Sequence, residues 1–263
     1  MGKGGLCCDG TCNKNEQNQS DSNRMYCDDK DDDMKGPVDT SNWIVKDKIM
    51  TGEYPGNKED HLHISNLSCL LDNGIRVFVC LQEESELKNF RPYKDDVLKI
   101  AVEKGIDPNT IEFMHFPMED GGVAESVEVL ADFIETLLSK LNDAAGDDNN
   151  NDNDNDRGDN NVDDDKKRSR KIYLHCWAGR GRTGIIAACL LGRLYKVSGL
   201  DALRRTQACY EQRIVGFGES PEYHPQKMQV IQYLRLIRQR DGDLNVSGGL
   251  NMSGGLGSSS ENK

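Results

Sequence analysis

Long apolar segments are missing from this sequence, which has no run of 18 hydrophobic residues and no apolar leader near its start. A membrane-spanning helix needs such a run, and a secretory signal needs such a leader. The chain nevertheless carries nine cysteines. Because disulfides are uncommon in the reducing interior of cells, we expect a cytoplasmic protein with free thiols.

Signals for metal ions and nucleic acids are missing as well. No Cys/His spacing matches a zinc site, and no basic stretch provides a nucleic-acid footprint. The net charge of −12 comes from two segments: residues 147–165 carry nine Asp and one Arg, and residues 28–33 carry five Asp and one Lys. The remainder is formally neutral, so the acidity identifies no partner. We predict a monomer without a metal, a cofactor or a nucleic-acid partner.

Three parts of the chain have compositions that disfavour folding. Residues 1–39 are polar, residues 241–263 are rich in Gly, Ser and Asn, and residues 143–170 contain the Asp/Asn tract. Such segments bury too little apolar surface to offset the entropy lost on ordering. We therefore predict one folded domain over residues 40–240, with disordered tails and a disordered acidic insert (143–170) that expands a loop.

One segment, residues 171–184, reads Lys-Ile-Tyr-Leu-His-Cys-Trp-Ala-Gly-Arg-Gly-Arg-Thr-Gly. Its apolar start predicts a short buried strand, and the apolar run from Ile185 to Leu194 predicts a helix that begins near Arg182. The glycine-containing loop between them would aim backbone N–H groups and the positive end of the helix dipole at one point. The sequence therefore predicts an anion site at this loop.

Cys176 lies at the base of this predicted anion site, where the same electric field favours the reactive thiolate. Arg182 offers a planar guanidinium to two phosphate oxygens, and Thr183 can donate its hydroxyl to the sulfur. Gly179 and Gly181 would let the backbone adopt conformations that are costly for other residues. A nucleophile, an oxyanion cradle and a bidentate clamp together predict a phosphate-ester hydrolase.

The pattern His175-Cys176-x5-Arg182-Thr183 resembles the signature of the cysteine-dependent protein tyrosine and dual-specificity phosphatases. An unrelated buried Cys before a helix would explain neither the His nor the fixed spacing of the glycines, Arg and Thr. The resemblance implies that the four residues of the pattern are catalytic and that the loop binds the substrate phosphate. The phosphate-binding residues are then Trp177, Ala178, Gly179, Arg180, Gly181 and Arg182.

Hydrolysis of a phosphate ester also needs a proton for the departing oxygen, usually from a carboxylic acid on a loop. The segment Phe116-Pro-Met-Glu-Asp-Gly-Gly122 follows an alternating strand pattern and carries two adjacent carboxylates. It resembles the acid loop of the cyclin-dependent-kinase-associated phosphatase, which implies that Asp120 is the acid, with Glu119 as the alternative. From the residues alone, each carboxylate also fits a solvated loop charge.

A third match lies downstream, where Ser220-Pro-Glu-Tyr-His-Pro-Gln226 precedes a helical pattern that reaches Ile237. It resembles the Ser-Pro-Glu-Thr-x-x-Gln segment of the same superfamily, with Tyr223 in place of the usual Thr. The resemblance implies that Gln226 positions the water that breaks a phosphocysteine intermediate. The alternative is a polar residue in the first turn of a surface helix.

Strand patterns alternate with helical patterns through residues 40–240. An entry strand and a turn are predicted at residues 42–56, and further strands at residues 74–81 and 172–174. The helical patterns cover residues 61–71, 127–141, 183–195 and 228–237. This alternation predicts an α/β fold with a mostly parallel central sheet flanked by helices. The Cys-x5-Arg loop would then lie at the carboxyl end of a central strand, where ligands bind in such sheets.

Cys80 ends the strand predicted at residues 74–81, and the carboxyl end of a parallel strand would face the phosphate loop. Several dual-specificity relatives carry a resolving cysteine at this place, so the resemblance implies that Cys80 is a redox partner of Cys176. The alternative is a small buried hydrophobic residue, the common state of a free cysteine.

The start of the chain contains candidate acylation sites at Gly2, Cys7 and Cys8. Gly2 would take myristate and the cysteines palmitate, which together would tether the protein to a membrane. Leu6 replaces the Ser or Thr of the myristoylation pattern, so a plain disordered tail is the alternative.

We predict a metal-independent protein phosphatase that hydrolyses phosphotyrosine, or phosphoserine and phosphothreonine as well, through a phosphocysteine intermediate. The alternatives within this reaction class are inositol-phosphate, phosphoinositide and RNA 5′-phosphate phosphatases. Arg180 adds the positive charge found in phosphoinositide members, but Trp177 stands where those often carry Lys. A non-catalytic phospho-binding module is the third possibility, and the presence of Cys176, Arg182 and Asp120 argues against it.

Overall fold

The computed structural model describes residues 33–142 and 170–247. Most of the predicted tails and acidic insert, including Gly2, Cys7 and Cys8, lie outside these residues. Within them, no single helix is long and apolar enough to cross a membrane. Two consecutive helices, Gly181–Tyr195 and Gly199–Tyr210, reach that length and apolar composition only when taken together, and they are bent by 119° relative to each other.

A five-stranded sheet with the order β1-β2-β5-β3-β4 forms the centre of the fold. The strands are β1 (Ser41–Val45), β2 (Ile49–Gly52), β3 (Ile75–Cys80), β4 (Glu112–His115) and β5 (Lys171–His175). The β1–β2 pair is antiparallel, and the other three neighbouring pairs are parallel. The predicted α/β fold with a mostly parallel sheet is therefore confirmed.

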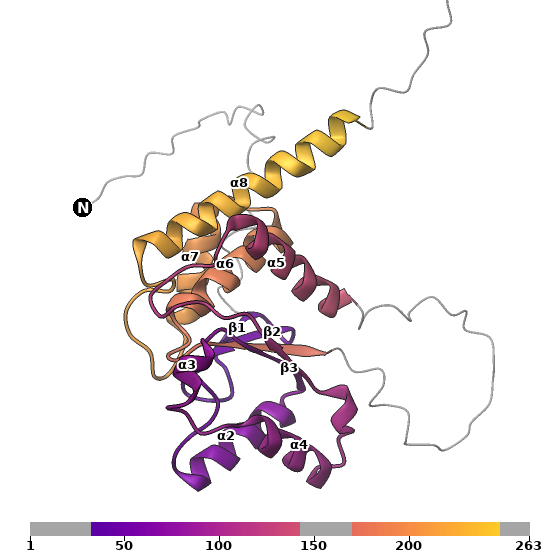
Figure 1. Ribbon diagram of the computed structural model, residues 1–263, viewed down its shortest axis with the longest axis vertical. Coiled ribbons are helices and arrows are strands. Elements are labelled where there is room, and N and C mark those ends of the chain that lie inside the picture. The colour runs from indigo at the N-terminus through magenta and orange to yellow at the C-terminus, as the bar shows by residue number, and fades with distance from the viewer. Residues whose placement is uncertain (1–32, 143–169, 248–263) are drawn as a thin grey trace, which may run out of the picture. The chain divides into compact units, whose positions relative to one another are not determined.

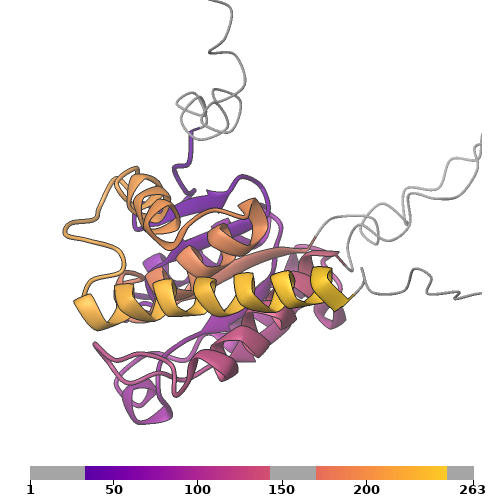
Figure 2. The same ribbon diagram turned by 90° about the horizontal axis from the view of Figure 1, so that it is seen from above.

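Helices cover both faces of the sheet (Figure 1). They are α2 (Asp60–Asp72), α3 (Glu84–Leu87), α4 (Lys94–Glu103), α5 (Val127–Asn142), α6 (Gly181–Tyr195), α7 (Gly199–Tyr210) and α8 (His224–Ser247), with a 3-10 turn η2 at Pro108–Thr110. One layer contains α2 and α4, and the other contains α5 to α8. Figure 2 shows α8 lying across the second layer, beside α5 and α6.

The core helix α6 is buried from Arg182 to Gly192 between the sheet and its neighbouring helices. Gly192 makes the approach of α8 possible, because a Cβ there would lie 2.3 Å from Leu234 Cδ1. A helix that is apolar on nearly every side is expected to be a core helix, and the prediction for residues 183–195 is confirmed.

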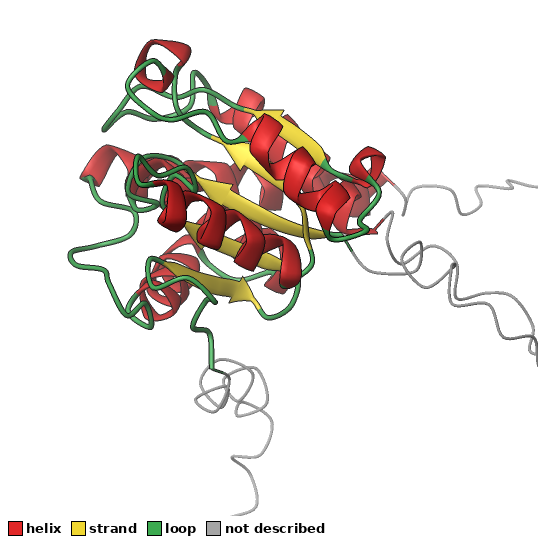
Figure 3. Cartoon of the chain, turned by 90° about the horizontal axis from the view of Figure 1, so that it is seen from below, coloured by secondary structure: helices red, strands yellow, loops and turns green. Residues whose placement is uncertain are grey.

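The central strand β5 is buried on both faces, with Ile172, Tyr173 and Leu174 each at most 2% exposed. Such continuous burial is typical of parallel strands covered by helices. Its last residue, His175, is in register with Gly52 of β2 and with Cys80 of β3. Three parallel strands therefore end at one edge of the sheet, and long loops gather there (Figure 3).

The entry strand and turn predicted at residues 42–56 belong to a hairpin, in which β1 pairs with β2. The chain reverses between β1 and β2, where Asp47 has a left-handed φ of 56°. The helices α4 and α7 were not predicted.

At the domain boundary, Met34 is buried and its carbonyl accepts a hydrogen bond from Trp43 N at 2.7 Å, so residues 34–39 belong to the fold rather than to the tail.

Candidate active site

The loop between β5 and α6 forms a cradle at the carboxyl end of the central strand. His175 ends β5, and α6 begins at Gly181 with Arg180 as its N-cap. Gly179 has a left-handed φ of 64°, and a Cβ there would lie 2.0 Å from the carbonyl oxygen of Gly52. The predicted conformational need for glycine at position 179 is confirmed, since a side chain would collide with β2.

Cys176 lines a pocket of about 260 Å3 beside this cradle, and only 3% of the residue is exposed. Most of the predicted site residues line the same pocket: Asp120, Cys176, Trp177, Ala178, Arg180, Gly181, Arg182 and Gln226. Gly121, Glu222 and Tyr223 complete the lining. Three segments that are far apart in sequence thus meet around one cysteine.

Arg182 extends from the first turn of α6, and its side chain is only 1% exposed. Its terminal nitrogens donate to both carboxylate oxygens of Glu86, to the carbonyl oxygen of Met118 at 3.0 Å and to Asp120 Oδ1 at 2.9 Å. These four bonds use all four terminal N–H groups. The Nε–H group is not among them, so a phosphate that binds Arg182 through two N–H groups displaces one of these acceptors.

The acid loop follows β4, and its first part is fixed to the sheet. Met118 is buried and its N–H donates to the carbonyl oxygen of Leu81 at 3.1 Å. The next two residues, Glu119 and Asp120, are exposed, but only Asp120 lines the pocket. The geometry therefore supports Asp120, rather than Glu119, as the candidate acid.

Gln226 is fully buried and connects two loops. Its amide oxygen accepts hydrogen bonds from the N–H groups of Glu222 and Tyr223, both at 3.1 Å, and Nε2 donates to the carbonyl oxygen of Gly122 at 3.0 Å. A Cβ on Gly181 would lie 2.9 Å from Nε2, so glycine is needed there for space rather than for the backbone conformation that we predicted. One Nε2 hydrogen remains for a water molecule.

Arg180 is committed to the loop that follows α7. Its guanidinium pairs with both carboxylate oxygens of Glu222 and donates to the carbonyl oxygen of Phe217 at 3.1 Å. The guanidinium also lies 5.5 Å from the centre of the Phe217 ring. The positive charge that we predicted for phosphate binding is thus compensated by an adjacent carboxylate.

His175 is fully buried behind the cradle, and burial lowers the pKa of His175 from 6.5 to about 3. Nδ1 lies 3.3 Å from the carbonyl oxygen of Cys176, and Nε2 lies 2.8 Å from the hydroxyl of Tyr93. Because a carbonyl only accepts, the neutral ring carries its hydrogen on Nδ1 and accepts from Tyr93. His175 therefore holds the loop and does not face the pocket.

Thr183 also lies behind the pocket. Its hydroxyl is buried and has no hydrogen-bond partner within residues 33–142 and 170–247. The predicted hydrogen bond to the sulfur of Cys176 is therefore not formed in this state, and the O–H group of Thr183 is still available to donate one.

Cys80 lies on β3 in register with His175, the residue before Cys176. Continuing the usual spacing and rise of strands by one residue past the end of β5 gives about 6 Å between the Cα atoms of Cys80 and Cys176, which is within the range that a disulfide can bridge. Burial raises the pKa of Cys80. Both thiols are free.

Two further residues support the site and were not predicted. Although burial raises the pKa of Glu86, hydrogen bonds led by that from Arg182 hold it below its ordinary value. Arg213, which is 8% exposed, donates to the carbonyl oxygens of Ala178 at 3.3 Å and Gly179 at 3.0 Å. Arg213 does not line the pocket, so these carbonyls are bonded to a group outside it. No local sequence signal marks either residue, because each acts on a loop far along the chain.

Residues 38–241 match the family described as “PTP-SAK: Swiss Army Knife protein, DSP-PTPase phosphatase domain”. The match covers all five strands of the sheet and includes the Cys176 cradle, the acid loop and Gln226. The chain belongs to this phosphatase family. Its α/β sheet with helices on both faces is the fold of that family.

Similar proteins agree with this assignment. The protein “Putative tyrosine phosphatase 067L” of Invertebrate iridescent virus 3 is 27% identical over 176 residues, which are 67% of this chain and 55% of that protein. The chain thus spans about half the length of this relative. The crystal structure of PTPMT1 in complex with PI(5)P has a TM-score of 0.50 at 16% identity, covering 77% of this chain and 99% of that one.

A human tyrosine phosphatase-like serine/threonine/tyrosine-interacting protein also has a TM-score of 0.50, at 13% identity, covering 78% of this chain and 99% of that one. At these identities, the two solved structures show a shared fold. Activity and substrate must be argued from the residues of this site.

Proposed function

We propose that this protein is a phosphatase that hydrolyses phosphate monoesters of proteins through a covalent phosphocysteine intermediate. The observation that supports it most is the meeting of Cys176, Arg182 and Asp120 in one pocket of about 260 Å3. These residues supply a nucleophile, a fixed cation and a carboxyl group. A module that only binds phosphate has no need for Asp120 at this place.

In the first step, the sulfur of Cys176 attacks phosphorus and the bond from phosphorus to the leaving oxygen breaks. Asp120 gives its proton to that oxygen. Arg182 and the N–H groups of the loop stabilise the charge on the transferred phosphoryl group. Arg213 contributes by donating to two loop carbonyls from outside the pocket.

In the second step, a water molecule attacks phosphorus and the bond to sulfur breaks. Asp120 takes the proton from this water, and Cys176 leaves as thiolate while phosphate is released. The free Nε2 hydrogen of Gln226 is available to position the water. Its other polar contacts, all with backbone groups, fix the direction of that hydrogen.

Asp120 reaches its role through an exchange of partners. In the present state it accepts a hydrogen bond from Arg182 at 2.9 Å. A phosphate that takes this donor removes the cation from Asp120 and places negative charge beside it. The carboxyl group of Asp120 is then free to turn toward the leaving oxygen.

A protein substrate is favoured over a polyphosphorylated one by the charge of the pocket wall. Glu222 neutralises Arg180, so Arg182 is left as the main cation for a single phosphate group. A phosphoinositide or inositol phosphate would benefit from the charge that Glu222 cancels. The resemblance of the acid loop to the cyclin-dependent-kinase-associated type remains a prediction.

The test is to assay purified full-length protein with a small aryl phosphate, phosphotyrosine and phosphothreonine peptides, an RNA 5′-phosphate and a soluble inositol phosphate. We expect turnover of the aryl phosphate and of at least one phosphopeptide. Binding of the phosphopeptides without turnover of any substrate would identify a phospho-binding module. Turnover of the inositol phosphate or RNA substrate alone would exclude a protein phosphatase.

We also propose that Cys80 protects the nucleophile during oxidation. Peroxide would convert the Cys176 thiolate to sulfenic acid with reduction of the peroxide to water, and the Cys80 thiol would then form the disulfide with release of water. After excess peroxide, we expect activity to return with dithiothreitol in the wild type but not in Cys80→Ala, where the unprotected sulfenic acid of Cys176 is oxidised further to the irreversible sulfinic acid. Cys189→Ala, which alters a buried cysteine of α6, serves as the control. Equal recovery of all three proteins would refute the role of Cys80.

A further inference from the structure

A second cleft lies beside the phosphate pocket and has a volume of about 410 Å3. Its lining comes from the loop after β2, from the segment around α3 and from the phosphate loop: Gly56, Lys58, Glu86, Asn89, Phe90, Arg91 and Trp177. Trp177 lines the phosphate pocket as well. A substrate held at Cys176 therefore has to pass Trp177 to enter this cleft.

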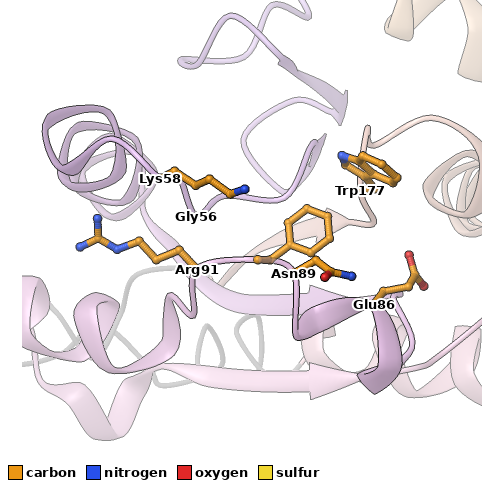
Figure 4. A pocket seen from close by; sticks show the side chains of 7 residues that line it. Gly56, Lys58, Glu86, Asn89, Arg91 and Trp177 are labelled. Atoms are coloured by element: carbon orange, nitrogen blue, oxygen red, sulfur yellow. The ribbon is translucent and has the colours of Figure 1, made fainter.

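The cleft has one cation that the protein does not neutralise. Arg91 pairs with Asp60 at 2.5 Å, and Glu86 pairs with Arg182. Lys58 is exposed and has no ion pair or hydrogen bond in the described part of the chain. Figure 4 shows the Lys58 ammonium directed toward the Trp177 side of the cleft and the Arg91 guanidinium directed away from it.

Aromatic rings supply an apolar wall to the same cleft. Trp177 is 58% exposed, and its ring meets that of Phe90 edge to face with centres 5.7 Å apart. Phe90 is held in turn by Tyr54, at 4.7 Å between ring centres. Large exposed aromatic residues held in this way are common anchors for protein partners.

We propose that this cleft binds an acidic residue adjacent to the phosphorylated residue of a protein substrate, with Lys58 as its specificity-determining cation. The proposal rests on the proposed function, because it adds a subsite to the same reaction. Lys58 matches one carboxylate, and the Trp177–Phe90 wall matches the aliphatic part and the peptide backbone.

A second phosphate fits the cleft less well than a carboxylate. Phosphate groups are usually bound by several donors, often by the fork of an arginine. Here Arg91 is committed to Asp60, and Lys58 alone remains. The cleft therefore favours an acidic peptide over an inositol ring that carries several phosphates.

The test uses two phosphotyrosine peptides that differ only in having Asp or Asn on both sides of the phosphotyrosine. We expect wild-type kcat/KM to be about two- to fivefold higher for the Asp peptide, which is the range of an exposed ion pair, and this ratio to fall with added salt. In Lys58→Met the ratio should fall to about one. Lys88→Met removes an exposed lysine that does not line the cleft, and it should keep the wild-type ratio.

A small aryl phosphate separates failure of this proposal from failure of the proposed function, because it reports the phosphate pocket alone. If neither wild type nor Lys58→Met hydrolyses the aryl phosphate, the ratio is measured instead as the affinity for the two peptides, with Cys176→Ser introduced into both proteins. An equal ratio in wild type and Lys58→Met, in turnover or in affinity, would overturn the proposal. Loss of activity in Lys58→Met on a soluble inositol bisphosphate, without a change in the peptide ratio, would overturn it too.

Discussion

The phosphate loop and the acid loop meet at one pocket, but they differ in burial and in the way they are held. In the phosphate loop, Cys176 and Arg182 are at most 3% exposed, and Arg213 fixes two carbonyl groups from behind. In the acid loop, the Asp120 side chain is 63% exposed and is held to the pocket by one hydrogen bond from Arg182. The phosphate loop is fixed by buried contacts before a ligand binds. The acid loop is held to the pocket by a hydrogen bond that a ligand can replace.

This difference in burial and hydrogen bonding suits the two loops to different steps of phosphate-ester hydrolysis. Donors that stabilise developing charge are most effective when they need no rearrangement during the reaction. A general acid must instead change its protonation state and its partner within each turnover. Buried Arg182, which Glu86 and the carbonyl oxygen of Met118 hold in place, suits the first task, and exposed Asp120 suits the second.

The largest effect is expected from Arg182→Lys, which keeps the charge but loses the planar fork. Each fixed donor to a developing charge contributes about 10²–10³-fold, so we expect kcat/KM for a small aryl phosphate to fall by roughly 10³-fold or more. Arg180→Lys, in the same loop but paired with Glu222, should lose about tenfold or less. Similar losses in the two variants would mean that the cradle does not depend on Arg182.

A smaller and substrate-dependent effect is expected from Asp120→Asn. A missing general acid should reduce turnover by about 10²-fold or more on an alkyl phosphate, and less on an aryl phosphate, whose leaving oxygen needs little protonation. Glu119→Gln should have a minor effect, because Glu119 does not line the pocket. A greater loss of turnover in Glu119→Gln than in Asp120→Asn would identify Glu119 as the general acid.

Arg213→Met tests whether the cradle is held from behind. The change leaves the carbonyl oxygens of Ala178 and Gly179 without this donor, which should lower the free energy of unfolding by about 1–3 kcal/mol. We expect kcat to fall more than KM rises, with partial recovery in Arg213→Lys. The exposed Arg204, which pairs with Asp201 at 2.8 Å, offers a control in Arg204→Met. Unchanged kcat in folded Arg213→Met would show that the loop holds its shape alone.

The smallest effect concerns pH and stability. The pKa of His175 is about 3 in the fold and 6.5 as an ordinary histidine, so below about pH 6.5 the unfolded chain binds a proton that the folded one does not. The free energy of unfolding should then decrease as the pH falls, by up to about 1.4 kcal/mol per pH unit from this group.

Urea unfolding between about pH 7 and pH 5 measures this slope. The slope should be smaller in His175→Gln and unchanged in His61→Gln, because His61 is exposed. An identical slope in wild type and His175→Gln would contradict the buried neutral imidazole.

The sequence predicted those parts of the site that are local in the chain. The nucleophile, the glycines and Arg182 lie within eight residues, so their spacing alone indicates one loop at one helix start. The helix α6 was predicted for the same reason, since its apolar run is continuous. Asp120 and Gln226 required resemblance to a family, because a carboxylate or an amide in a loop has many uses.

The parts that were not predicted depend on contacts between distant segments. Glu86 reaches Arg182 across 96 positions, and Arg213 reaches Gly179 across 34, so neither leaves a local pattern. The helix α4 buries only three residues and α7 only four, which gives each a weak periodic signal. The predicted phosphate-binding role of Arg180 rested on its charge, and its pairing with Glu222 emerges only from the fold.

The central claim is that Cys176 carries the phosphoryl group during turnover. Rapid acid quenching of wild-type protein with a good aryl phosphate substrate, followed by mass spectrometry of its peptides, measures this directly. We predict phosphate on the peptide that contains Cys176, and neither this adduct nor turnover in a Cys176→Ser variant that is folded and still binds phosphate. Turnover near the wild-type rate in Cys176→Ser, or phosphate on another residue, would contradict the account.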